Sequence, residues 1–210
     1  MAEAADRVFV GKEPAAQEHV TRHKGVDRLF HWLTAAAVLT LMTTGLLPPL
    51  GVKFDWVVIH WSVGVVLVLL VLFHIVRALF WQRLKCMFWL SAKEIAGKEV
   101  TKYSIAQKLM HHAMTAMVLA AVITGCLMLM KMDTPLWKRD PYTLSQATWG
   151  IIYVIHGAAA VSAISLVFIH IYFAILTEKR MYLRAMILGW MTRRELIEHH
   201  ESGGAAEKKT

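Results

Sequence analysis

Four long apolar runs are the feature that most limits how this chain can fold. They cover Leu29–Leu47, Val57–Phe80, Leu109–Met130 and Trp149–Leu176. Each has about the 20 residues that a helix needs to cross the hydrocarbon core of a bilayer. A segment in lipid must also satisfy its own backbone hydrogen bonds, which an α-helix does. The sequence therefore predicts an all-α fold: a polytopic membrane protein with a bundle of four transmembrane helices.

The charged residues lie between and beyond these runs. The net charge is +8, and the basic residues gather before the first run, between the second and third, and after the fourth. Because positively charged loops stay in the cytoplasm, both termini are expected there. Topology explains the charge, so no nucleic-acid partner is expected. The predicted organisation is a polar cytoplasmic N-terminal tail at 1–25, a membrane domain at 26–177 and a cytoplasmic C-terminal tail at 178–210.

Cysteine and tryptophan positions narrow the class further. Cys86 and Cys126 form neither a C-x-x-C nor a C-x-x-C-H pattern. Covalent c-type haem, an iron–sulfur cluster or a cysteine zinc site made by this chain alone is therefore not expected. Residues 1–25 lack the apolar stretch of a cleavable signal. The eight tryptophans, Trp149 and Trp89 among them, fall near the ends of the runs, as in the aromatic belts of membrane proteins.

Histidines supply the candidate chemistry. His156 and His170 stand fourteen residues apart in the fourth run. On a helix that spacing rises about 21 Å and returns to within about 40° of the starting direction. The two imidazoles therefore lie on one face, one near each side of the membrane. They could be structural groups satisfied by hydrogen bonds, but polar groups inside a membrane are costly and usually functional. The spacing is the one that two stacked haems need from a shared helix.

Sorting the histidines by depth gives two groups. His60 lies near the outer side with His156, whereas His31 and His74 lie near the inner side with His170. One outer and one inner pair would hold two b-type haems, and two axial histidines leave the iron suited to electron transfer. Spacing alone pairs His170 with either His74 or His31. No carboxylate lies at mid-membrane, which argues against an ion-coupled or proton-coupled transporter.

Several residues near the membrane surfaces have two interpretations each. Arg77 could meet a haem propionate or extend to the inner headgroups. Gln107 and Lys108 could hold a quinone headgroup or anchor the start of the third helix. Gly45 could leave room for a macrocycle or serve helix packing. The third helix is otherwise expected to have a packing role.

Five short motifs occur in order along the chain. They are D-R-L-F-H-W at 27–32, V-I-H-W-S-V-G at 58–64, Y-S-I-A-Q-K at 103–108, V-I-H-G-A-A-A at 154–160 and F-I-H-I-Y-F-A at 168–174. Together they resemble the cytochrome b (gamma) subunit of membrane-bound formate dehydrogenase, over roughly residues 20–200. The wider superfamily includes the cytochrome b anchors of nickel–iron hydrogenases. A hydrogenase or another periplasmic oxidoreductase is therefore the nearest alternative donor, and a haem-free anchor or transporter is the alternative from another class.

The resemblance implies two haem b groups in a respiratory electron-transport protein of the bacterial cytoplasmic (inner) membrane. In that family the outer haem iron is held by the histidines that match His60 and His156, and the inner haem iron by those that match His31 and His170. His74 then becomes a packing residue or a neighbour of the inner site. Among the two pairings that spacing allows for His170, the resemblance thus favours the first helix.

The resemblance also implies partners and a substrate. Menaquinone or ubiquinone would bind at the cytoplasmic side, beside a Y-N-x-x-Q-K motif in which Gln107 and Lys108 match and Ser104 replaces the asparagine. An iron–sulfur (beta) subunit and a molybdenum or tungsten catalytic (alpha) subunit would lie on the periplasmic side, in a heterotrimer that could assemble further. This chain would then reduce quinone and would not be catalytic for formate itself.

Overall fold

The computed structural model describes residues 18–81, 104–135 and 137–195 of the 210-residue chain. In these residues the elements are, in order, β1 (His19–Thr21), α1 (Gly25–Leu46), α2 (Trp56–Trp81), α5 (Ile105–Leu129), α6 (Gln146–Ile175), the 3-10 turn η2 (Thr177–Lys179), α7 (Arg180–Leu188) and β2 (Trp190–Thr192). The helices α1, α2, α5 and α6 are long and apolar enough to cross a membrane. The predicted helical membrane fold is confirmed.

Local signals in the sequence set the ends of these helices. α1 ends at Leu46, just before Pro48 and Pro49, which lack the backbone N–H that a helix needs. α6 begins after Ser145, whose side chain accepts the backbone N–H of Thr148. Such a cap satisfies one of the N–H groups that a helix start leaves without an internal partner.

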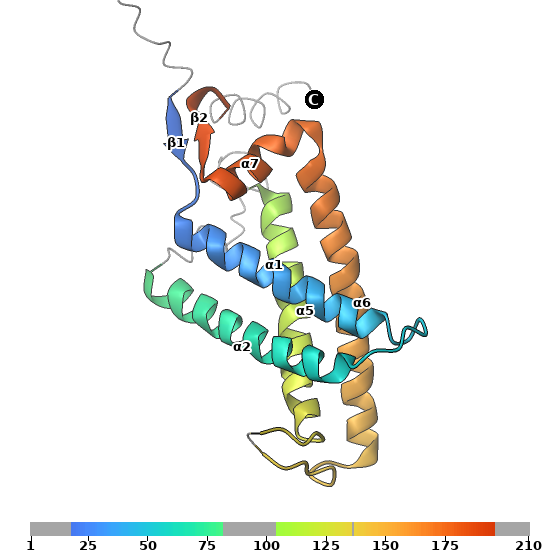
Figure 1. Ribbon diagram of the computed structural model, residues 1–210. Helices are drawn as coiled ribbons and strands as arrows, with labels where there is room; N and C mark the ends of the chain where they lie inside the picture. Colours follow the sequence, from blue (N-terminus) through green and yellow to red (C-terminus); the bar gives the residue numbers. More distant parts are fainter. Residues whose placement is uncertain (1–17, 82–103, 136, 196–210) are drawn as a thin grey trace, which may run out of the picture.

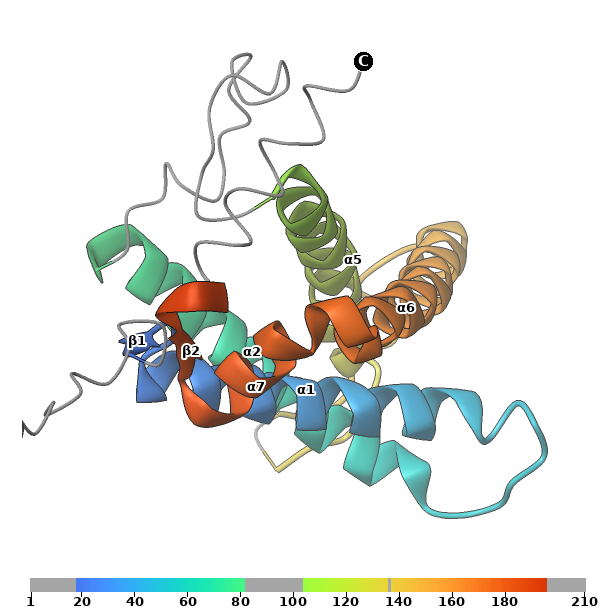
Figure 2. The same ribbon diagram turned by 90° about the horizontal axis from the view of Figure 1, so that it is seen from above.

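The four spanning helices form two antiparallel hairpins. α1 packs mainly on α2 and α5 mainly on α6, while α2 also contacts α5. The first hairpin is tilted across the second, and α7 lies near the start of α1 (Figure 1 and Figure 2). Many large apolar side chains point outward, for example Leu69 and Val154, as expected for helices that face lipid.

The two ends of the described chain fold together over one end of the bundle. β1 pairs with β2 in an antiparallel sheet, with Val20 opposite Met191. Below this sheet, Trp32 Nε1 donates to the carbonyl oxygen of Met186 at 3.3 Å. The sequence predicted a polar N-terminal tail and a cytoplasmic C-terminal tail in these regions, and no strand. Short pairing between residues so far apart in sequence leaves no periodic pattern that could be read from either segment alone.

The segment before α1 (residues 18–24) and the segment after η2 (residues 180–195) together form a small unit, here called the inner cap. Gly189 connects α7 to β2 within it. Its φ of +94° lies in the left-handed region, and a Cβ there would come within 2.5 Å of Arg28 Nη1 and 3.2 Å of the His23 carbonyl oxygen. Its own carbonyl oxygen accepts the backbone N–H groups of Arg22 and His23. Only glycine fits this conformation and this space without strain. The site thereby fixes the start of α1 against the end of α7.

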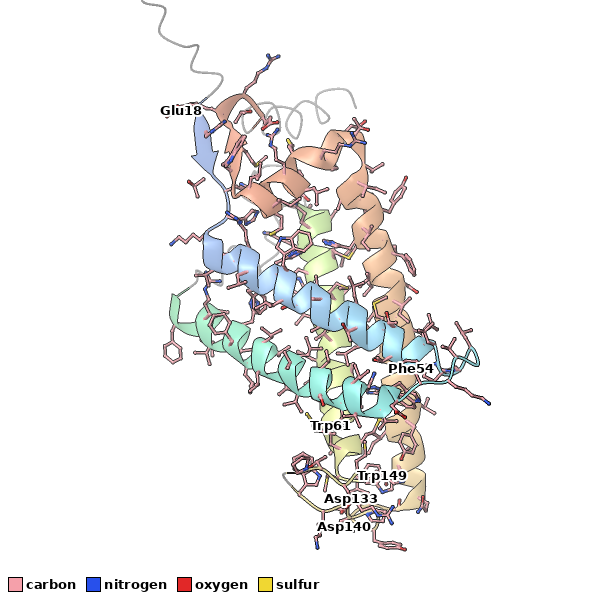
Figure 3. All side chains as sticks on the ribbon, in the orientation of Figure 1. Glu18, Phe54, Trp61, Asp133, Asp140 and Trp149 are labelled. Carbon is pink, nitrogen blue, oxygen red and sulfur yellow. The ribbon has the colours of Figure 1, made fainter. Side chains whose placement is uncertain are left out.

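The loop between α5 and α6 covers the opposite end, and it corrects one expectation. Trp149 was predicted to belong to an aromatic belt, yet only 1% of its surface is exposed. Its Nε1 donates to the Pro141 carbonyl oxygen at 3.1 Å, and Lys131 Nζ lies 5.0 Å from the ring centre. Figure 3 shows Trp149 beside the loop that carries Asp133 and Asp140. Trp149 therefore holds the loop against α6 instead of facing lipid headgroups.

Some expectations fall outside the described residues. These are Cys86, Trp89, most of the N-terminal tail and the last part of the C-terminal tail. The predicted division at residues 25 and 177 stays a prediction, although the structure shows that residues on both sides of each boundary contact one another through the inner cap.

Candidate functional site

The outer histidines lie opposite each other between two helices. His60 on α2 and His156 on α6 have ring centres 6.4 Å apart, with the ring planes at 72°. A metal–imidazole bond is about 2 Å long, so two imidazoles on opposite sides of one metal have centres about 6 Å apart. Both rings are only partly covered by protein. The pair has the separation that bis-histidine ligation of one iron needs.

Each outer histidine is held by a threonine from the neighbouring helix of its own hairpin. Thr44 Oγ1 on α1 lies 2.8 Å from His60 Nδ1. Thr124 Oγ1 on α5 lies 2.9 Å from His156 Nδ1. Both threonines are buried, with 4% and 6% of their surface exposed. These contacts fix the orientation of both rings.

The same contacts assign the protons. The Thr44 hydroxyl donates to the Thr40 carbonyl oxygen at 2.8 Å, and the Thr124 hydroxyl donates to the Ala120 carbonyl oxygen at 2.6 Å. Each hydroxyl has a single hydrogen, so both contacts are satisfied together when the histidine carries its proton on Nδ1. In that tautomer Nε2 carries no proton and can ligate iron. Metal-binding histidines commonly have such a partner on the other ring nitrogen.

A glycine follows each threonine and faces the same histidine. A Cβ on Gly45 would lie 3.6 Å from His60 Cε1, and a Cβ on Gly125 would lie 3.3 Å from His156 Cε1. The Gly45 position is thus next to the outer histidine pair, where a Cβ would make an ordinary contact, and the Gly125 position is tighter. Both glycines therefore lie beside the outer histidines, at the packing surfaces of their own hairpins.

The inner histidines form a second pair at the other depth. His31 on α1 and His170 on α6 have ring centres 6.4 Å apart, at an interplanar angle of 48°. Nδ1 of His31 is buried without a hydrogen-bond partner among the described residues. A buried polar nitrogen without a hydrogen-bond partner costs free energy. Of the two partners that spacing left open for His170, the structure brings His31 into position.

His74 lies at the same depth as the His31–His170 pair but belongs to a different group of contacts. Its ring stacks on Phe30 with centres 4.9 Å apart and planes at 12°, and it faces His111 on α5 at 6.3 Å. Both contacts come from helices other than α6. The third helix of the bundle therefore does more than pack, since it supplies Thr124 to the outer pair and His111 to His74.

Arg77 has a protein partner that the sequence analysis did not consider. Its Nη1 lies 2.5 Å from Oδ1 of Asp27, and the two side chains are only 16% and 28% exposed. The pair links the end of α2 to the first turn of α1. The propionate role of Arg77 stays a prediction, and in this structure the guanidinium is directed to the carboxylate.

The candidate quinone residues form the start of α5. Ser104 Oγ accepts the backbone N–H of Gln107, and Gln107 Oε1 accepts that of Ser104. This reciprocal arrangement is a capping box, which explains why serine and glutamine suit these positions structurally. Lys108 is 1% exposed, and its carbonyl oxygen accepts from His112 Nδ1 at 2.6 Å. The structure thus brings Ser104, Gln107 and Lys108 together at the inner end.

The threonine partners were not found from the sequence. A weak signal was present, because a Thr-Gly pair occurs at 44–45 and again at 124–125. Threonine in a membrane helix usually bonds its own backbone, so neither residue stands out by type. Only the packing of the helices shows that the hydroxyl oxygens also meet imidazoles.

The donor set of the two pairs fits haem better than a bare metal ion. Among residues 18–81, 104–135 and 137–195, no group of three or more His, Cys, Asp or Glu side chains could hold a metal ion. A haem brings its own equatorial ligands and needs only two axial groups from the protein. His60 with His156, and His31 with His170, are the residues that would supply them.

Comparison with known proteins agrees with this geometry. The family model described as prokaryotic cytochrome b561 matches residues 22–189, which include all four spanning helices, η2 and α7. No curated protein matches the chain. Proteins of this family are multi-pass membrane proteins that bind haem b. The chain belongs to the prokaryotic cytochrome b561 family and is a membrane haem b electron-transfer protein.

Proposed function

We propose that the chain is the cytochrome b subunit of a periplasmic formate dehydrogenase in the bacterial inner membrane. It carries electrons from an iron–sulfur subunit on the outer side to quinone on the cytoplasmic side. The observation that carries this proposal is the presence of two histidine pairs at two depths, His60 with His156 and His31 with His170. Formate as the source of electrons rests on the five sequence motifs.

α6 is the element that joins the two depths. It supplies His156 to the outer pair and His170 to the inner pair, about 21 Å apart along the helix. Haem b at each pair would supply reversible one-electron oxidation and reduction. The protein fixes the ligands, excludes water from the span and sets the distance. Because each pair uses both axial positions, the site favours electron transfer over oxygen binding.

The charges of the spanning helices suit electron transfer without a proton channel. In the four described spans the only carboxylate is Asp27, which lies in the first turn of α1 and is paired with Arg77. Formate oxidation would release its proton outside, and quinone reduction would take protons from the cytoplasm. Moving one electron inward against about 100 mV costs about 2.3 kcal/mol, which the formate reaction must supply.

We place the quinone site at the inner end of α5, near Gln107 and Lys108. Gln107→Ala would not test the quinone site cleanly, because it would also remove part of the capping box and cost about 1 kcal/mol of stability. Gln107→Glu keeps the cap acceptor and removes the amide donor. It should slow quinone reduction at least several-fold while formate still reduces the haems. Ser145→Thr, which keeps the capping hydroxyl at the start of α6 and lies at the opposite end of the bundle, is the matched control and should leave turnover unchanged.

The identity of the donor is tested on the native complex. A tag on this chain should co-purify an iron–sulfur subunit and a molybdenum or tungsten subunit, and formate should reduce the b-type absorbance of that complex. Co-purification of a nickel–iron subunit, with reduction by hydrogen and not by formate, would assign the chain to a hydrogenase. A preparation without haem would leave only the anchor or transporter interpretation, and would contradict the family assignment as well.

A further inference from the structure

Two histidines at the inner depth belong to neither of the candidate haem pairs. His74 on α2 and His111 on α5 have ring centres 6.3 Å apart, with the ring planes at 62°. Both side chains are partly buried, and both lie in helices long enough to span a membrane. Ionisable groups inside a membrane are costly, and they usually mark a path for a substrate, an ion or a proton. A role beyond packing is therefore expected for this pair.

The pair lies beside the residues at which we place the quinone. On α5, His111 follows Gln107 by four residues and the buried Lys108 by three. Side chains at these spacings are neighbours on one face of a helix. The adjacent His112 is directed to the Lys108 carbonyl oxygen, with Nδ1 at 2.6 Å from it. His111 is thus the histidine through which the start of α5 meets His74 on α2.

Aromatic and apolar side chains around the pair suit a planar, lipid-soluble molecule. Phe30 lies flat against His74, with ring centres 4.9 Å apart and planes at 12°, and its ring centre lies 6.1 Å from that of Phe73. Phe73 on α2 and Leu109 on α5 are exposed on the surface that would face lipid. A respiratory quinone has a flat headgroup and an apolar tail, so it needs both a ring to stack on and an opening to lipid.

The pair is also next to the inner haem ligands. Phe30 directly precedes His31 in α1. The ring that covers His74 and a ligand of the inner haem therefore come from the same turn of one helix. A quinone headgroup at His74 and His111 would lie at the end of the bundle where electrons arrive.

Charged groups lead from the pair to the inner surface. Arg77 follows His74 by three residues and forms an ion pair with Asp27, which lies in the first turn of α1. Both groups act electrostatically on His74, and His74 and His112 act in the same way on His111. The Asp27 side chain is 28% exposed, so water reaches this end of the row. Asp27, Arg77, His74 and His111 thus form a row of polar groups between water and the pair.

We propose that His74 and His111 bind one carbonyl oxygen of the quinone and supply a proton to it during reduction. The inference rests on the proposed quinone function and does not depend on formate as the donor. Histidine suits this task because its ordinary pKa lies close to neutral pH.

The step balances as follows. Reduction of a quinone to a quinol takes two electrons and two protons, and each carbonyl oxygen gains one hydrogen. Both electrons come from the inner haem b. The histidine pair gives one proton to the carbonyl oxygen that it binds and changes from imidazolium to imidazole. Water at the inner surface supplies the second proton and restores the imidazolium through the row that begins at Asp27.

The experiment follows oxidation of haem by a quinone in the purified full-length chain, so that no donor enzyme is needed. The b-type haem is reduced with stoichiometric dithionite and mixed by stopped flow with a soluble short-chain naphthoquinone. The rate of loss of the reduced band should fall between about pH 6 and 8, because an ordinary imidazolium loses its proton across this range. His74→Gln and His111→Gln keep a hydrogen-bond donor but do not titrate. Each should lower the rate at the acid end at least about tenfold and flatten the pH profile.

Two controls separate proton transfer from a structural role. His112→Gln changes the neighbouring histidine and should keep both the rate and the pH profile of the unmodified protein. Added imidazole should restore part of the rate in His111→Gln and should have no effect on the unmodified protein. A histidine that only packs between helices would not be rescued in this way.

A further variant keeps the test decisive if a glutamine variant folds poorly. His74→Phe retains a ring to stack on Phe30 but has no proton to give, and it should be as slow as His74→Gln. Haem content and the reduced-minus-oxidised spectrum check that each variant is folded. A pH-independent rate in the unmodified protein would overturn the proposal even without any variant.

The outcomes distinguish this inference from the proposed function. If the naphthoquinone oxidises the haem equally fast, with one pH profile, in the unmodified protein, His74→Phe and His111→Gln, the proton role is wrong and the quinone function stands. If the naphthoquinone does not oxidise the haem of the unmodified protein, the quinone function is wrong and this inference falls with it.

Discussion

Thr124 Oγ1 lies 2.9 Å from Nδ1 of His156, and its hydroxyl hydrogen is already used by the Ala120 carbonyl oxygen. Because a carbonyl oxygen can only accept, both contacts of the threonine are satisfied together when His156 carries its proton on Nδ1 and leaves Nε2 available. Thr44 does the same for His60. The outer histidine pair is thus oriented by two threonines from the neighbouring helices.

The first prediction concerns these threonines. Thr124→Val or Thr44→Val keeps the shape but removes the acceptor, so retention of the outer haem should weaken roughly 10- to 100-fold. Haem titration into the apoprotein measures the change, and a potentiometric titration should show a shift in one component only. Thr124→Ser keeps the hydroxyl, so its haem retention and its midpoint potentials should equal those of the unmodified protein.

Thr43→Val is the control for Thr44, because the exposed Thr43 hydroxyl bonds only the Leu39 carbonyl oxygen within its own helix. It should leave haem retention unchanged. Equal effects of Thr43→Val and Thr44→Val would show that the loss comes from the helix and not from His60.

The second prediction uses the two glycines. A Cβ at position 125 would lie 3.3 Å from His156 Cε1, closer than nearly all ordinary contacts, whereas a Cβ at position 45 would lie 3.6 Å from His60 Cε1. Gly125→Ala should therefore disturb the outer haem more than Gly45→Ala, as seen in the low-spin electron paramagnetic resonance signal. Gly150→Ala, where nothing lies within 4 Å, should be silent. A reversed order of the two main variants would contradict the described geometry.

The third prediction concerns the ion pair of Asp27 and Arg77. Both side chains are mostly buried, so removal of one partner leaves a poorly solvated charge. Arg77→Leu should destabilise the protein by about 1–3 kcal/mol, below the range for a fully buried pair because some solvent reaches both groups. Asp27→Asn/Arg77→Leu should lose less than Arg77→Leu alone. Thermal unfolding in detergent measures both, and additive losses would show that the residues do not interact.

The fourth prediction is a pH dependence of the inner cap. Partial burial alone would raise the pKa of Glu195, but the Thr192 amide and the Arg184 guanidinium hold that pKa below its ordinary value. The carboxylate thus stabilises the cap at pH values above the ordinary pKa, and this stabilisation is lost as the pH falls through the lowered pKa.

Hydrogen exchange of the β2 amides, measured between about pH 3 and 6 and corrected for intrinsic rates, should show progressive loss of protection toward the acid end. Glu195→Gln should have lower protection at neutral pH and little dependence on pH. An unchanged profile in Glu195→Gln would assign the acid sensitivity to another group, such as the exposed Glu18 that pairs with Arg193.

Much of the fold could be predicted because membrane spans leave a strong signal. Each of the four apolar runs overlaps a helix, and Pro48 marks the end of α1. The pairing of His170 could not be predicted from spacing, since His31 and His74 lie at similar depth and only helix packing separates them. The strands β1 and β2 were missed because each is short and depends on a partner far along the chain.

The reason that the threonines and His111 were missed is more general. Helical periodicity shows which face a residue shares, but not which helix that face meets. The hairpins had to be assembled before α5 could be seen to supply Thr124 to His156 and His111 to His74.

The most direct test of the account is a potentiometric optical titration of the reduced-minus-oxidised b-type band in the unmodified chain and in three ligand variants. His156→Ala should remove one component, the outer haem. His31→Ala and His170→Ala should each remove one and the same other component. The absence of a b-type band, or the loss of different components in His31→Ala and His170→Ala, would contradict the assignment of these residues to one inner haem.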